Sequence, residues 1–234
     1  MNNFFVQKIQ GLRQKIPRVD IDPLAKIKEV FNDRNCTFKF KPVGQDDVLK
    51  IISALKNTKS GGLDYIGTMT IKLIAKEILP AVTHIINLSL SQGSFPTSWK
   101  QAKVVPLLKK GDPLSPKNYR PVALLPILSK ILEKAVFIQI AGYLDEEKLL
   151  NANHHGSRGG HSTATALIQM YDHWTQEVDD GNMVGVMMID LSAAFDMVDH
   201  SLLLDKLRLF GLGEPAIQWF QSYLSGRTQS VLID

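Results

Sequence analysis

The sequence predicts an α+β fold, and three patterns lead to that prediction. Apolar residues recur with a helical period over residues 45–55 and 126–143. Two short apolar runs rich in β-forming residues, 102–108 and 119–125, flank a basic segment with glycine and proline, which is typical of a β-hairpin. A continuous apolar run at 183–189 has the composition of a buried central strand.

Further helices are predicted between these patterns, bounded by glycine, proline or capping residues. They span residues 68–79, 81–91, 164–178, 193–198, 202–210 and 215–224. Pro80 would occupy the first turn of the second of these helices, and Ser162 would cap the third. Tyr171 and Trp174 fall on the apolar stripe of the third helix, so we interpret them as core residues rather than as base-stacking platforms. The other predicted segments are a weakly organised lead-in at 1–37, a short strand or extended lead at 38–43, and the start of another strand at 227–234.

The composition is that of an ordinary globular protein. The chain has 234 residues, enough to bury a sizeable core, of which 44% are hydrophobic and 21% charged. No run approaches the roughly 18 to 20 apolar residues of a membrane span, so no contact with a membrane is expected. The first residues carry no secretory signal, and a single cysteine, Cys36, excludes an internal disulfide. An intracellular location, in the nucleus or the cytoplasm, is therefore expected.

Positive charge is concentrated in one stretch of the chain. The net charge of +4 permits binding to polyanions. Between Lys100 and Arg120 there are six basic residues and one acid, Asp112. This pattern leaves two interpretations open, a solvated loop or a surface that contacts phosphates.

Asp190 directly follows the apolar run, where a buried strand would reach the edge of its sheet. A charge there is costly to bury unless it is paired, and a sheet edge is a rigid place from which to hold a metal. Phosphoryl transfer to a nucleotide uses Mg²⁺ held by carboxylates and substrate phosphates. The alternative is that Asp190 caps the next helix, and the apolar run alone leaves both interpretations open.

Residues 188–200, Met-Ile-Asp-Leu-Ser-Ala-Ala-Phe-Asp-Met-Val-Asp-His, resemble the first palm motif of reverse transcriptases, in the form typical of non-LTR (LINE-type) retrotransposons. Four further segments resemble parts of the same family, in the same order, over residues 38–234. They are an upstream fingers entry (59–64), the fingers hairpin (99–125), the helix that follows it (129–134) and a template-contacting loop (155–163). Any one segment is weakly specific, whereas the ordered series is highly specific.

The resemblance implies a right-hand polymerase fold, in which helical fingers with a β-hairpin lead into an incomplete antiparallel palm sheet. It divides the chain into a lead-in or connector (1–37), fingers (38–180) and a partial palm (181–234). The implied function is that of a fragment of an RNA-directed DNA polymerase. Such an enzyme uses Mg²⁺, an RNA template, a DNA primer and deoxynucleoside triphosphates.

The resemblance also implies roles for residues around the first palm motif. Asp190 corresponds to the catalytic aspartate that binds Mg²⁺, and the backbone carbonyl of Leu191 corresponds to a further metal ligand. The backbone groups of Ala193 and Ala194 would face the incoming triphosphate. Phe195 matches the bulky residue that excludes a ribose 2′-hydroxyl, and a place in the core is the alternative for this side chain.

In the fingers, Arg120 corresponds to the arginine that holds the triphosphate, a role that suits a planar and permanently charged guanidinium. Lys109 or Lys110 would add charge from the hairpin, and the sequence leaves the choice between them open. Arg158 corresponds to a contact with the template backbone. The other polar residues of the palm motif are interpreted as capping or structural groups: Asp196, Asp199 and His200.

Two later palm motifs of the family have no counterpart after Asp190, namely a Pro-Gln-Gly turn and a hairpin with two adjacent aspartates. Fewer anionic ligands mean weaker Mg²⁺ binding. We therefore expect that the 234-residue chain alone does not polymerise DNA. The alternative function is that of a catalytically dead, truncated or decayed element that keeps only nucleic-acid binding.

Overall fold

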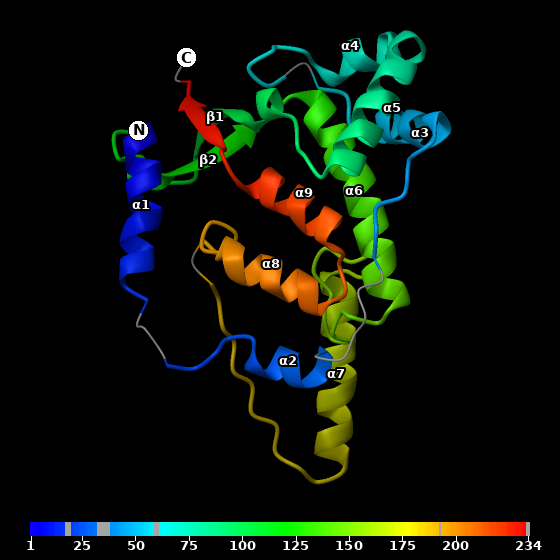
Figure 1. Cartoon of the computed structure of the whole chain (residues 1–234). Coiled ribbons are helices and arrows are strands. Elements are labelled where there is room, and N and C mark those ends of the chain that lie inside the picture. The colour runs from blue at the N-terminus through cyan, green and yellow to red at the C-terminus, as the bar shows by residue number, and fades with distance from the viewer. Residues whose placement is uncertain (17–19, 32–37, 59–60, 192, 233–234) are drawn as a thin grey trace. The chain divides into compact units, whose positions relative to one another are not determined.

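The structure is a computed structural model that describes residues 1–16, 20–31, 38–58, 61–191 and 193–232. Cys36, residues 59–60 of the fingers entry and residue 192 of the palm motif lie outside the described residues. Most of the described elements are helices, and three strands form one small sheet, so the predicted α+β class is confirmed (Figure 1). The helices are α1 (Asn2–Gln14), α2 (Ala25–Phe31), α3 (Gln45–Ala54), α4 (Thr68–Leu73), α5 (Ala75–Gln92), α6 (Ile127–Glu146), α7 (Thr163–Asp179), α8 (His200–Leu209) and α9 (Glu214–Leu224). The strands are β1 (Gln101–Leu108), β2 (Tyr119–Leu124) and β3 (Thr228–Val231).

The chain forms two compact units. The first comprises Met1–Ala141 with Phe195–Asp234, and the second comprises Gly142–Ala194. The first unit holds the sheet, and the second holds α7 with the glycine-rich loop before it. No helix among the described residues is long and apolar enough to cross a membrane.

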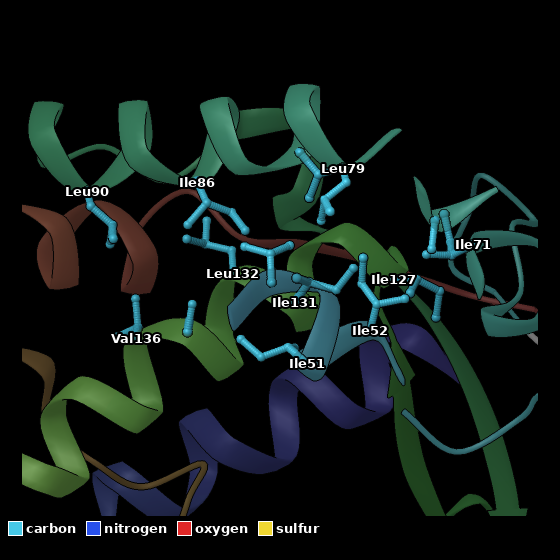
Figure 2. Close-up of a cluster of buried hydrophobic side chains, with 14 of the residues drawn as sticks. Ile51, Ile52, Ile71, Leu79, Ile86, Leu90, Ile127, Ile131, Leu132 and Val136 are labelled. Carbon is cyan, nitrogen blue, oxygen red and sulfur yellow. The ribbon is translucent and has the colours of Figure 1, made fainter. Parts of the chain in front are cut away.

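The core of the first unit is built around α6. Ile127, Ile131 and Leu132 of this helix are at most 1% exposed, and they meet apolar side chains from three other helices (Figure 2). Those partners are Ile51 and Ile52 of α3, Ile71 of α4, and Leu79, Ile86 and Leu90 of α5. Apolar residues three and four positions apart lie on one face of a helix, which is why the helical period in the sequence located this core correctly.

Trp219 of α9 joins this core to the end of α5. Its side chain is 1% exposed, and its ring meets Phe95 edge-on at 5.7 Å and stacks on Tyr223 at 5.3 Å between ring centres. The indole Nε1 donates a hydrogen bond to Ser89 Oγ at 3.0 Å, so this buried polar atom is satisfied. Ser89 Oγ in turn donates to the carbonyl of Ser94 at 2.6 Å, which holds the chain as it leaves α5.

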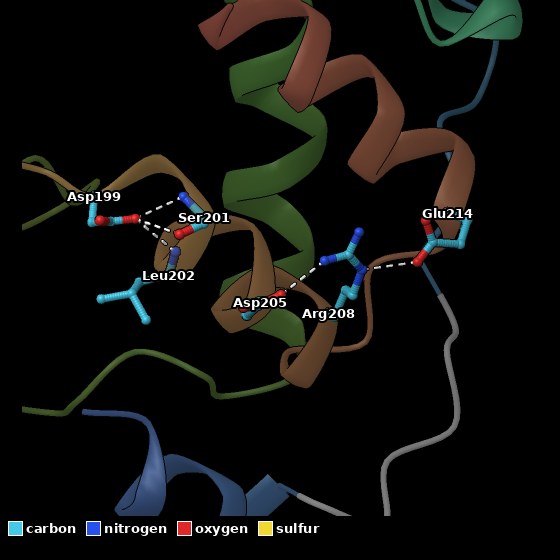
Figure 3. Close-up of polar contacts among 6 residues, drawn as sticks. All are labelled: Asp199, Ser201, Leu202, Asp205, Arg208 and Glu214. Atoms are coloured by element: carbon cyan, nitrogen blue, oxygen red, sulfur yellow. Dashed lines mark hydrogen bonds and ion pairs between the residues drawn. The ribbon is translucent and has the colours of Figure 1, made fainter. Parts of the chain in front are cut away.

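The connection between α8 and α9 is held by charge and by a backbone bridge. Arg208 pairs with Asp205 in its own helix and with Glu214 at the start of α9, both at 2.9 Å (Figure 3). The backbone N–H of Phe38 donates to the carbonyl of Gly211 at 3.0 Å. The predicted strand or extended lead at 38–43 therefore amounts to a single bridge at its first residue.

The sheet has the strand order β2–β1–β3. β1 and β2 pair in antiparallel fashion, with Val104 opposite Ala123 and Leu107 opposite Arg120, which confirms the predicted hairpin. β3 confirms the predicted strand after residue 227, but it lies parallel to β1 at the open edge of the hairpin. The described strands thus form one mixed sheet, and the expected antiparallel palm sheet is not found among them.

The predicted central strand at 183–189 is wrong. This segment is irregular, pairs with no strand in the described part of the chain, and exposes Met183, Met187 and Ile189 by at least 80%. A strand needs a neighbour for its backbone N–H and C=O groups, so apolar composition alone does not make one. The predicted helix at 193–198 is also wrong, because Ala193 has a φ of 55° and the following residues form turns.

Two predictions near the N-terminus also need correction. The lead-in is not weakly organised, since it contains α1 and α2, and α1 buries Phe5 and contacts β3. Pro80 does not separate two helices, because α5 runs through it from Ala75 to Gln92. Pro80 is exposed while Leu79 is buried, so the packing of this helix outweighs the one backbone hydrogen bond that proline lacks.

α7 forms where the sequence predicts it. The Ser162 side chain caps it by accepting from the backbone N–H of Thr165 at 3.2 Å. However, no residue of α7 is buried: Tyr171 is 69% exposed and Trp174 is half-buried. The core interpretation is wrong for Tyr171 and holds only in part for Trp174, because a periodic pattern predicts a helix but not the element that would cover its face.

Truncating the centre of α6 should destabilise the first unit strongly. Ile131→Ala should lower the free energy of unfolding by about 2–5 kcal/mol, because it leaves a cavity in the core. Ile138→Ala is the matched control, since this side chain of the same helix is 51% exposed, and its effect should stay within about 0.5 kcal/mol. Urea denaturation followed by circular dichroism measures both, and equal losses would contradict the core described here.

Candidate nucleotide and nucleic-acid interface

The tip of the β1–β2 hairpin is a closely bonded turn. The backbone N–H of Lys109 donates to the carbonyl of Asn118 at 2.9 Å, and Asn118 Nδ2 donates to the carbonyl of Asp112 at 2.9 Å. Gly111 has a φ of 87°, and a Cβ atom there would lie 2.9 Å from Asn118 Nδ2. Glycine is therefore required at this position, and the turn holds Lys109 and Lys110 at the end of the hairpin.

One face of the hairpin collects positive charge. Side chains alternate between the two faces along a strand, and residues directly opposite each other share a face. Arg120 lies opposite Leu107, so Lys103 and Lys109 fall on the same face as Arg120. Lys110 lies one residue further, in the turn. We call Lys103, Lys109 and Arg120 the cationic face.

Lys103 is a member of the cationic face that the sequence analysis did not identify. Its side chain is partly exposed, and its ammonium lies 5.1 Å from the ring centre of Tyr65. Every second residue of a strand lies on the same face, so the spacing from Arg120 through the expected hairpin would have placed Lys103 on this face. The number of basic residues in this stretch does not show which of them share a face, whereas their odd or even spacing along the strand does.

A half-buried carboxyl group lies in α6, close to the end of α9. Glu133 Oε1 accepts from Ser129 Oγ at 2.9 Å. Burial raises the pKa of Glu133, while the Ser129 hydrogen bond and the charge of Arg227 oppose that shift. Burial and the negative charge of Glu133 raise the pKa of Tyr223 as well. Arg227 stacks 4.2 Å from the ring centre of Tyr223, so the cluster links α6, α9 and the start of β3.

In the second unit, the glycine-rich loop is bonded to α7 and to the end of α6. His155 contacts Thr165 Oγ1 through Nδ1 at 3.0 Å and Gln169 Oε1 through Nε2 at 2.7 Å. Arg158 forms an ion pair with Asp145 at 3.0 Å, and its side chain is 20% exposed. The guanidinium that the sequence assigns to the template is therefore held by an acid within the same unit, and its contact with template stays a prediction.

Asp190 and Leu191 lie in exposed, irregular backbone of the second unit. Asp190 caps no described helix, because Asp199 is the capping residue of the next one, α8. The capping interpretation of Asp190 is therefore wrong. Within the described ranges, no three His, Cys, Asp or Glu side chains gather as a metal site. Asp190 and the Leu191 carbonyl offer hard oxygen donors of the kind that Mg²⁺ prefers, but they are only part of a complete ligand set.

The palm motif continues in the first unit as an exposed turn that leads into α8. Phe195 is 93% exposed, so its alternative interpretation as a core residue is wrong. Asp199 Oδ1 accepts from the backbone N–H groups of Ser201 at 2.9 Å and Leu202 at 3.1 Å (Figure 3). Hydrogen bonds from the Ser201 side chain and then from these backbone groups lower the pKa of Asp199. The capping role expected for Asp199 is confirmed.

The hairpin thus has a bonded tip and three cations on one face, and an exposed aspartate lies in the palm motif. The chain belongs to the reverse transcriptase (RNA-dependent DNA polymerase) family, whose model matches residues 107–232, more than half of the chain. The family resemblance seen in the sequence is therefore confirmed.

The chain is similar to polymerases of insect mobile elements. It is 31% identical over 188 residues to the "Probable RNA-directed DNA polymerase from transposon BS" of Drosophila melanogaster, covering 80% of this chain and 21% of that protein. It is 30% identical over 194 residues to the RNA-directed DNA polymerase from mobile element jockey of Drosophila funebris, covering 82% of this chain and 21% of that protein. The chain thus spans about a fifth of the length of these relatives.

The raised pKa of Glu133 predicts a pH dependence of stability. The folded state holds this proton more tightly than the unfolded state does, whose reference pKa is 4.5. The stability that Glu133 contributes is therefore fully present below pH 4.5 and is lost as the pH rises through the raised folded value. Glu133→Gln should abolish this loss in urea titrations on both sides of that pH. The exposed control Glu77→Gln should keep it, and a wild-type pH profile in Glu133→Gln would refute the assignment.

Proposed function

We propose that this chain is the nucleotide-binding front part of an RNA-directed DNA polymerase longer than 234 residues. One observation carries the proposal: the hairpin motif of the family folds here into a bonded turn that puts Lys103, Lys109 and Arg120 on one face. The proposal is further supported by relatives that are RNA-directed DNA polymerases by name and of which the chain spans about a fifth.

In this proposal, Arg120 holds the phosphates of the incoming deoxynucleoside triphosphate. A guanidinium can bind two phosphate oxygens at once and stays charged at every physiological pH. Lys109 makes the second contact rather than Lys110, because Lys109 shares the face of Arg120 and is held by its backbone bond to Asn118. Lys103 adds charge further along the same face.

The proposed metal is Mg²⁺, with the Asp190 carboxylate and the Leu191 carbonyl as ligands. Both residues are exposed, so their oxygen atoms are accessible to an ion. When bound, Mg²⁺ would supply positive charge to the attacking hydroxyl and to the leaving pyrophosphate. Further carboxylate ligands would come from the rest of the longer protein.

The family resemblance implies three more contacts. Phe195 would exclude a ribose 2′-hydroxyl, and its 93% exposed ring is free to take that place. The backbone groups of Ala193 and Ala194 would face the triphosphate. Arg158 would bind a phosphate of the RNA template, an interaction that does not depend on base sequence, with Asp145 orienting its guanidinium.

Removing the guanidinium of Arg120 should weaken nucleotide binding. Arg120→Ala should raise the dissociation constant of a fluorescent deoxyadenosine triphosphate by about 10- to 100-fold, the worth of one or two charge-assisted hydrogen bonds. Arg120→Lys should recover only part of this loss, because an ammonium cannot bind in the same forked geometry. Fluorescence anisotropy of the 234-residue chain measures the binding. The control is Lys76→Ala on exposed α5 surface, and an Arg120→Ala chain that binds as tightly as this control would remove Arg120 from the site.

The proposed metal role of Asp190 is tested in the longer protein that carries this chain. Asp190→Asn should reduce Mg²⁺-dependent extension of a DNA primer on an RNA template to background, because the neutral amide is a poor ligand for a hard cation. Asp172→Asn, on the exposed surface of α7, should leave extension unchanged. Full extension by Asp190→Asn would show that another carboxylate holds the metal.

A further inference from the structure

A groove lies on the face of the sheet opposite the cationic face. The register places four small or polar side chains together on its floor: Ala102 of β1, Pro121 and Ala123 of β2, and Gln229 of β3. α1 forms a wall of the groove with residues that include Phe5 and Ile9. Its volume of about 730 Å³ lies within the roughly 300–1,000 Å³ that is usual for ligand sites.

The groove carries an excess of positive charge. Lys8 and Arg13 line it from α1, and Lys100 and Arg227 line it from the ends of β1 and β3. Asp196 is the carboxylate among the lining residues, and Asp199 and Glu133 offset part of the charge of Arg13 and Arg227. Lys8 is exposed. Arg13 Nη2 donates to the carbonyl of Val198 at 3.1 Å, and the other N–H groups of Arg13 make no hydrogen bond to a described residue. His200 also lines the groove and would add charge if protonated.

Two of these cations are held with incomplete partners. Lys100 is 9% exposed, and its ammonium makes one long contact among the described residues, 3.5 Å to Ser222 Oγ. Arg227 donates from Nε to the carbonyl of Tyr223 at 2.6 Å, while its Nη2 is buried with no hydrogen-bond partner in the described part of the chain. Cations fixed in this way, where water is partly excluded, attract an anion more strongly than freely solvated ones do.

We propose that this groove is a second binding site for single-stranded nucleic acid, separate from the cationic face. Lys8 and Arg13 would contact successive phosphates, Lys100 and Arg227 would add positive charge from the ends of the strands, and the apolar side chains of Ile9, Pro121 and Ala123 would pack against sugars and bases. A free phosphate compound would use the cations but not these apolar contacts. The identity of the occupant rests on the proposed function, whereas the groove itself does not.

The test uses the 234-residue chain and a fluorescein-labelled oligouridine of 12 nucleotides, about the length that a single-strand site covers. Lys8→Gln with Arg13→Gln should weaken binding about tenfold and reduce the slope of log affinity against log salt by about 1.4, since each phosphate contact on a single strand contributes about 0.7. Lys26→Gln with Lys76→Gln removes two exposed charges away from the groove and should change neither value. Circular dichroism and thermal unfolding check that each variant is folded.

A substitution that fills the groove without changing charge locates the site. Ala123→Trp should weaken oligouridine binding as strongly as the α1 variant, yet leave binding of the fluorescent deoxyadenosine triphosphate unchanged. Wild-type oligouridine affinity in either groove variant would overturn the proposal. Complete displacement of the oligouridine by inorganic tripolyphosphate at equal phosphate concentration would also overturn the proposal, because the occupant would then be a small phosphate compound. If Arg120→Ala fails to weaken nucleotide binding while Ala123→Trp weakens oligouridine binding, the groove is retained as a binding site and the proposed function is rejected.

Discussion

The burial of the Trp219 indole is the contact on which the rest of the first unit depends. Its hydrogen bond to Ser89 and its ring contacts with Phe95 and Tyr223 fix α9 against α5 and against the chain that leads into β1. The three residues after α9 then lead directly into β3, which pairs with β1. The position of Arg227, and with it the charge at one end of the sheet, therefore follows from how one aromatic side chain packs.

The sheet uses its two faces differently, although both faces carry cations. On one face Arg120 and Lys109 are exposed beside a bonded turn. On the other face Lys100 and Arg227 are held by hydrogen bonds to α9, and α1 lines the same groove. The two faces can differ in this way because successive side chains of a strand point in opposite directions.

The sequence predicted the structure correctly where the residues of a segment determine its local fold without a distant partner. The α6 core follows from helical period, the hairpin from two β-rich runs around Gly111, and the caps of α7 and α8 from Ser162 and Asp199. It failed where structure depends on a partner elsewhere in the chain. The run at 183–189 has the composition of a strand, and α7 has an apolar stripe, but no element among the described residues pairs with the run or buries the stripe. The burial of Glu133 could not be predicted from the adjacent sequence either, because α9, which lies about ninety residues further along the chain, packs beside it.

The exposed run before Asp190 also has a chemical consequence. Its methionines Met183, Met187 and Met188 are 100%, 85% and 83% exposed, so their thioether sulfurs face solvent. Peroxide converts such sulfurs to sulfoxides, which turns a flexible apolar side chain into a polar one. Oxidative ageing of the purified protein will therefore begin in this run, beside the aspartate of the palm motif, and a methionine sulfoxide reductase would be needed to reverse it.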